Sequence, residues 1–208
     1  MSSYTVRDWV TVGLFGALWG VVEMTLGSAL HQAFPAQANT VLTGPLLAGI
    51  GVLVALTGRH FVRRRGSVWW IGVVAALLKL LSPGGATVGA IVAILMEGLL
   101  MEVMLSIARG PRLWAFVSGG ALAVAWNLPH KFVMMRVVYG KAVEAVYLKM
   151  VEDVGRVLGG DAPAGWLALI ILLGIYGGMG AAGGWGAWRL AGAVARRLGR
   201  SDKDEEEP

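Results

Sequence analysis

The sequence predicts an all-α integral membrane protein, a bundle of about six transmembrane helices with an extra amphipathic helix before the last span. Three observations support this fold class. Of the 208 residues, 56% are hydrophobic and 15% are charged. The mean hydropathy is +0.66, which exceeds what a soluble domain of this size needs to fill its core. Apolar stretches also recur along the chain, at the length of about 20 residues that a spanning helix requires.

Six stretches are apolar enough to be spanning helices. They cover residues 10–30, 41–58, 68–82, 86–108, 113–130 and 164–190. The first is longer than the apolar core of a signal peptide and contains Glu23, so we interpret it as a retained span. The third and fourth are separated by the residues Ser-Pro-Gly-Gly at 82–85, which favour a tight turn over one continuous helix. We expect a single membrane domain over residues 1–200.

Two segments differ from these spans. The connection 131–163 is too polar to span, and its charged residues recur at helical spacing opposite an apolar face. It is predicted to form an amphipathic helix at the outer surface, either a connector lying on that surface or a lid over a pocket. The acidic segment 201–208 is predicted to be a disordered tail.

The basic residues predict the orientation, because cytoplasmic loops of membrane proteins carry the excess of Lys and Arg. An inside N-terminus places twelve of the 18 on the cytoplasmic side: Arg7, Arg59, Arg63, Arg64, Arg65, Arg109, Arg112, Arg189, Arg196, Arg197, Arg200 and Lys203. A multi-pass protein of the cell membrane with both termini in the cytoplasm follows. The net charge of +5 is then explained by the lipid bilayer, without a nucleic-acid partner.

Ionisable residues within spans are costly and normally find partners. Counting the rise of about 1.5 Å per residue places Lys79 and Glu97 near the midplane. We therefore predict a buried Lys79–Glu97 ion pair, either as structural support or as part of a substrate or proton path. Glu102 is rotated by about 140° from Glu97 and is expected to contact head groups or a partner protein.

A second polar group is expected near the outer face. Glu23 lies in the outer half of the first span, at a depth similar to that of polar and aromatic residues around 126–131, and the first connection adds His31 and Gln32. Polar groups with aromatic walls are typical of small-molecule sites. The predicted substrate-binding residues are Glu23, Trp126, Asn127, His130 and Lys131. The alternative interpretation is a set of unrelated polar side chains at the membrane interface.

Several classes of chemistry have no sequence support. The chain has no cysteine and no HExxH or HxxxH pair, so neither a metal site nor a cofactor is predicted. It also has no P-loop, no GxSxG motif and no pair of aspartates within a span. We therefore expect that the protein is not an enzyme, and that any uphill transport is driven by a partner or an ion gradient.

Small residues repeat at four-residue intervals in the first and last spans. The first span contains Gly13/Ala17 and Gly16/Gly20, and the last contains Gly174/Gly178 and Gly180/Gly184. Such faces allow helices to approach closely. They serve either packing within the bundle or docking of another membrane protein.

Six spans in about 200 residues, inside termini, the small-residue face of the first span and outward polar groups together resemble the S components of energy-coupling factor (ECF) transporters. The resemblance implies binding of a vitamin or its precursor near the outer face, with residues 31–44 acting as a gate. It also implies that Gly13, Gly16, Ala17 and Gly20 contact a coupling membrane subunit, while cytoplasmic ATPases supply the energy. The alternatives are a stand-alone structural or regulatory membrane protein, and a proton-coupled carrier that uses Lys79 and Glu97.

Overall fold

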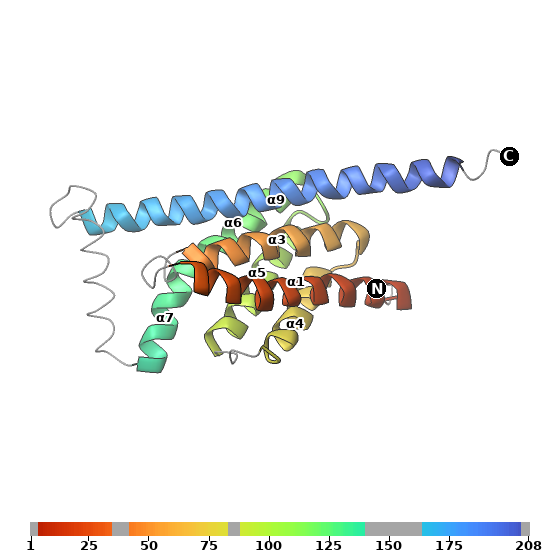
Figure 1. The fold of residues 1–208 in the computed structure, drawn as a ribbon. Coiled ribbons are helices and arrows are strands. Elements are labelled where there is room, and N and C mark those ends of the chain that lie inside the picture. Colours follow the sequence, from red (N-terminus) through yellow and green to blue (C-terminus); the bar gives the residue numbers. More distant parts are fainter. Residues whose placement is uncertain (1–3, 35–41, 83–87, 140–163, 205–208) are drawn as a thin grey trace.

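The computed structural model describes residues 4–34, 42–82, 88–139 and 164–204, and these are almost entirely helical (Figure 1). The helices are α1 (Val6–Ala33), α3 (Gly44–Phe61), α4 (Ser67–Lys79), α5 (Val88–Ile107), α6 (Leu113–Ala125), α7 (Asn127–Tyr139) and α9 (Ala164–Asp204). The expectation of an all-helical chain is confirmed for these residues. Residues 140–163, which make up most of the predicted amphipathic segment, lie outside the described residues.

Four helices are long and apolar enough to cross a membrane, as a multi-pass membrane protein requires. The candidate spans are Val6–Leu30, Gly44–Phe61, Val88–Ile107 and Leu169–Arg197. Helices α4 and α6 have 13 residues each, which corresponds to a length of about 20 Å. This is shorter than the hydrocarbon core of about 30 Å. The six expected spans thus correspond to four helices of spanning length and two shorter ones.

Local sequence explains where these helices begin and end. Thr5 and Asp8 form a capping box at the start of α1, in which the Asp8 backbone N–H donates to Thr5 Oγ1 over 3.2 Å. Helix α6 ends at Ala125 because Pro129 has no N–H to donate to the Ala125 carbonyl, and its ring would clash with that carbonyl. The chain turns at Trp126, and α7 runs crosswise at the end of the bundle (Figure 1).

The helices run alternately up and down, which gives the bundle two distinct ends. At one end lies the α3–α4 turn with Arg63, Arg64 and Arg65, and here α1 starts and α9 finishes (Figure 1). We call this the basic end. The other end, where α7 lies, is called the opposite end. Helix α9 packs on α6 and α3, and α4 packs between α1 and α5.

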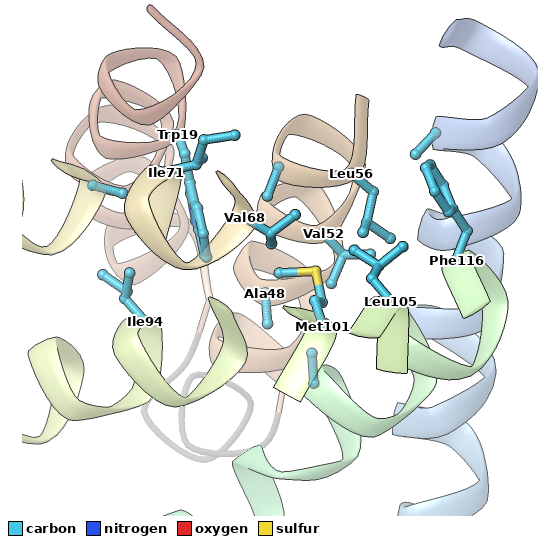
Figure 2. Close-up of a cluster of buried hydrophobic side chains, with 14 of the residues drawn as sticks. Trp19, Ala48, Val52, Leu56, Val68, Ile71, Ile94, Met101, Leu105 and Phe116 are labelled. Atoms are coloured by element: carbon cyan, nitrogen blue, oxygen red, sulfur yellow. The ribbon is translucent and has the colours of Figure 1, made fainter. Parts of the chain in front are cut away.

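The core is apolar and runs through the middle of the bundle, with Trp19, Ile71, Met101 and Phe116 fully buried (Figure 2). Glycine on a facing helix makes room for the largest of these. A Cβ at Gly51 would collide with the indole ring of Trp19, so α3 must carry glycine at this point. Close packing of this kind makes the helix arrangement specific.

The small residues of α1 form two faces with different surroundings. A Cβ at Gly16 would lie 2.5 Å from Val74 Cβ, and one at Gly20 would lie 2.8 Å from Leu78 Cβ. Both glycines are therefore buried against α4, and the expectation that they dock a partner is wrong. Gly13 and Ala17 are offset from them by about 60° around the helix and remain partly exposed. A Cβ at Gly13 would meet nothing within 4 Å.

Helix α9 shows the same division. A Cβ at Gly180 or Gly184 would collide with the backbone of α6, whereas one at Gly174 or Gly178 would meet nothing within 4 Å. The helix continues to Asp204, so the first four residues of the predicted disordered tail are helical. Residues 205–208 lie outside the described residues.

Candidate binding site

Polar side chains from four helices gather toward the opposite end of the bundle. They are Glu23 of α1, Lys79 of α4, Glu97 of α5, and Asn127, His130 and Lys131 of α7. We call this set the polar cluster. Glu23, Glu97, Asn127 and His130 each have 7% or less of their surface exposed. Burial of polar groups is costly unless they find hydrogen-bond or charge partners, so their contacts determine what the cluster can do.

Lys79 bonds to α1. Its Nζ lies 3.7 Å from Glu23 Oε2 and donates a hydrogen bond of 2.9 Å to the Glu23 backbone carbonyl. Gly27, one turn further along α1, faces the amine, and a Cβ there would lie at an ordinary contact distance of 3.7 Å from Nζ. The predicted Lys79–Glu97 ion pair is therefore wrong. Helix α4 directs Lys79 toward α1, whereas Glu97 of α5 bonds to Asn127 of α7.

Glu97 is the most deeply buried carboxylate of the polar cluster, with 3% of its surface exposed. Asn127 Nδ2 donates to Glu97 Oε1 over 2.9 Å. The other oxygen, Oε2, is buried and has no hydrogen-bond partner among the described residues. Glu97 also lies within electrostatic reach of the Glu23 carboxylate. Glu97 is thus held on one side by a neutral amide and is open to a hydrogen bond on the other.

The start of α3 lies against the same set of residues. A Cβ at Gly44 would lie 3.2 Å from Asn127 Oδ1 and 3.5 Å from Lys131 Nζ. Asn127 and Lys131 are four residues apart on α7, and side chains at this spacing share one helix face. From the sequence, Gly44 is included only as the last residue of the expected gate 31–44, and not among the binding residues. Its only signal was the Gly-Pro pair at 44–45, which marks the start of a helix.

His130 bonds to α5 nearer to the start of that helix than Asn127 does. Its Nε2 lies 2.8 Å from the Gly89 carbonyl oxygen. A carbonyl only accepts, so Nε2 carries the proton, and in the neutral ring Nδ1 is an acceptor. Trp126 lies beside it, with the ring centroids 6.0 Å apart. Within the described part of the chain, His130 Nδ1 and Trp126 Nε1 are both buried without a hydrogen-bond partner.

The structure thus brings the five predicted binding residues to the same end of the bundle, together with Lys79 and Glu97. Trp126 and His130 lie toward the start of α5, and Glu23 lies deeper, beside Lys79. Gln32 is exposed near the end of α1. Residues 35–41 of the expected gate and the side chain of His31 lie outside what the structure describes. No group of three or more His, Asp or Glu side chains suited to a metal ion occurs within the described ranges.

Glu102 occupies a different place from the expected one. It accepts hydrogen bonds from the backbone N–H groups of Gly66, over 2.7 Å, and Val68, over 3.1 Å. The carboxylate therefore caps the start of α4, where unpaired N–H groups and the helix dipole favour negative charge. The expectation that Glu102 contacts head groups or a partner protein is wrong, because the side chain is 7% exposed and points into the chain.

Arg59 completes this arrangement at the basic end. Its guanidinium is buried and donates to the carbonyl oxygens of Val62, over 3.0 Å, and Arg64, and to Ser67 Oγ. Tyr4 donates its hydroxyl to the Arg65 carbonyl over 2.7 Å. Burial, and then the nearby Glu102 charge, raise the pKa of the Tyr4 phenol. These contacts stabilise the α3–α4 turn and are made mostly with backbone groups of the chain itself. The polar residues at the basic end therefore have a structural role.

Comparison with known proteins identifies no relative: no family model matches the chain, and no curated protein or solved structure is significantly similar to it.

Proposed function

We propose that this chain is the substrate-capture membrane subunit of an importer of the ECF type, which binds a small nutrient such as a vitamin or its precursor. One observation carries the proposal. Four helices direct charged and amide side chains into an otherwise apolar bundle near a single end. Of the seven buried polar side-chain atoms without partners among the described residues, three lie at this end, in Glu97, Trp126 and His130. Buried polar groups are normally paired. Their convergence at one end favours ligand binding over support of the fold alone.

The two ends of the bundle support an orientation for this function. Cytoplasmic loops are enriched in Lys and Arg, so we assign the basic end to the cytoplasm and the polar cluster to the outside of the cell membrane. Both termini are then cytoplasmic, and the chain crosses six times, with α4 and α6 as short crossings. A nutrient reaches the polar cluster from outside in this orientation.

The energy for import comes from partners in this proposal, since the sequence contains no P-loop. A coupling membrane subunit and cytoplasmic ATPases fill that role. The docking face we propose on α1 is the stripe around Gly13 and Ala17. Val10, 65% exposed, and Leu14, 66% exposed, flank it, and small residues between them let a partner helix approach closely.

The binding proposal is tested by the thermal stability of the purified protein with a panel of vitamins and their precursors. At least one compound is expected to raise the melting temperature, and Asn127→Ala and His130→Ala are expected to reduce that increase. Thr25→Ala is the control, because the exposed Thr25 hydroxyl bonds only to Val21 of its own helix. A flat response across the panel would contradict the proposal.

The docking proposal is tested by co-purification with a coupling subunit and its ATPases from the same organism. Gly13→Leu is expected to abolish co-purification and to leave ligand binding intact. Gly174→Leu is the matched control, since a Cβ at either glycine meets nothing within 4 Å. Equal co-purification of both variants would show that this face of α1 is not the contact.

The alternative that the polar cluster only fixes helix packing has one observation in its favour. Glu23 and Lys79 join α1 to α4, and Glu97 and Asn127 join α5 to α7, so both pairs cross-link helices. In this case no compound binds, and a Glu23→Gln/Lys79→Met variant keeps all measurable properties except stability. The proton-coupled carrier was based on a Lys79–Glu97 pair, and the contacts of Lys79 remove that basis.

A further inference from the structure

The side chain of Glu97 lacks a contact that its chemistry requires. An ionised carboxylate is only an acceptor, and its two oxygens together accept several hydrogen bonds. Glu97 receives one, from Asn127, and this bond reaches Oε1 only. Oε2 is buried, and no donor in the described part of the chain reaches it. In its ionised form, Glu97 can therefore accept a further hydrogen bond at this oxygen.

No positive charge among the described residues pairs with Glu97. A buried carboxyl group stays ionised only when an opposite charge or several donors stabilise it, and otherwise it takes up a proton. The groups that act on Glu97 are a second carboxylate, Glu23, and the neutral amide of Asn127. The nearest ammonium group by sequence position, Lys79, bonds instead to the side chain and backbone of Glu23.

Other carboxylates of the chain show how its buried acids are usually accommodated. Glu102 stands on the same helix, five residues further on, and both of its oxygens accept backbone N–H groups. Glu23 has an ammonium partner. Glu97 differs from both in having neither a second donor nor a cation, although it is the least exposed of the three.

We propose that the candidate site takes a ligand with a positively charged N–H group, which donates to Glu97 Oε2 while Asn127 holds Oε1. This inference rests on the proposed function and specifies its substrate class as organic cations, such as protonated amines. The ligand supplies the missing hydrogen bond and the missing positive charge with one group.

The experiment adds three amines, putrescine, agmatine and histamine, to the vitamin and precursor panel, and compares them with succinate and pantothenate. The purified full chain is used, and dissociation constants are measured by calorimetry. At least one cationic compound is expected to bind. Glu97→Gln, which keeps the shape and removes the charge, should weaken that binding on the order of 10- to 150-fold, the range for a hydrogen bond to a charged group.

Glu102→Gln is the matched control, because it makes the same change in a buried acid of α5 that is already fully bonded, and the dissociation constant should stay unchanged. If Glu97→Gln does not fold, Glu97→Asp keeps the charge, withdraws it by one methylene, and should still weaken binding. If only compounds without a positively charged nitrogen bind, the inference is overturned and the proposed function still stands. Binding of no compound at all overturns both.

Discussion

Replacing Gly180 by alanine tests the packing that holds α9 on the bundle. A Cβ at this position would lie 2.6 Å from the carbonyl carbon of Gly120 on α6, and closer still to its oxygen. Non-bonded carbon atoms pack best at about 3.5–4.0 Å, so the two helices must separate by roughly 1 Å. Overpacking usually costs about 1–3 kcal/mol. We expect about 3 kcal/mol here, because the clash is with backbone and no change of rotamer relieves it.

The assay is equilibrium unfolding in mixed micelles, followed by tryptophan fluorescence. Gly178→Ala is the control on the same helix, since a Cβ there meets nothing within 4 Å, and alanine favours a helix over glycine by up to about 1 kcal/mol. This variant should be at least as stable as the parent protein. If Gly180→Ala is as stable as Gly178→Ala, then α6 and α9 do not meet through these glycines.

Three further predictions concern the buried polar contacts. Glu102→Ala should lower the free energy of unfolding by about 1–3 kcal/mol, because two backbone N–H groups lose their acceptor. Glu102→Gln keeps one acceptor and should lower it less. Equal losses for the two variants in a denaturant titration would refute the cap. In a double-mutant cycle on the free energy of unfolding, Glu23→Gln and Lys79→Met should show a coupling energy of about 0.5–3 kcal/mol. In a second cycle, the effects of Glu97→Gln and Lys79→Met should be additive. Coupling in the second cycle alone would show that Lys79 pairs with Glu97 and not with Glu23. Because folding raises the pKa of the Tyr4 phenol above its ordinary value of 10.0, its neutral form is favoured in the folded state, and stability should fall as the pH rises above about 10. Tyr4→Phe should show a smaller fall over this range, and an unchanged pH profile would contradict the assignment.

Positions along the bundle were predictable from the sequence, because hydropathy and the rise per residue depend only on chain order. The long apolar helices α1, α3, α5 and α9 appear near the expected ranges. The span expected over 113–130 is instead divided into α6 and α7 at Trp126, so one of the six ranges was not a single helix. The collection of polar side chains at one end follows from the same count, since alternating helices return residues such as Glu23 and Asn127 to similar depths.

Directions around each helix were not predictable, because they depend on which helices become neighbours. Helix α4 packs between α1 and α5, which both carry a carboxylate, and the rotation of α4 about its own axis selects Glu23. The two small-residue faces of α1 differ by about 60°, and the sequence does not show which one meets α4. The contacts of Glu102 were not predictable for another reason. Its partners are backbone N–H groups, and a pattern of side chains does not indicate which backbone groups come close.

Helix α7 is fastened to α5 at two heights. Asn127 bonds to Glu97, and His130 bonds to the carbonyl of Gly89. The two acceptors are eight residues, or about 12 Å, apart along α5, whereas the two donors are only three residues apart on α7. Because both side chains belong to one short helix, a displacement of α7 as a rigid body strains both bonds together. A displacement that draws Asn127 away from Glu97 is therefore expected to loosen the bond of His130 as well, so the two side chains behave as one unit.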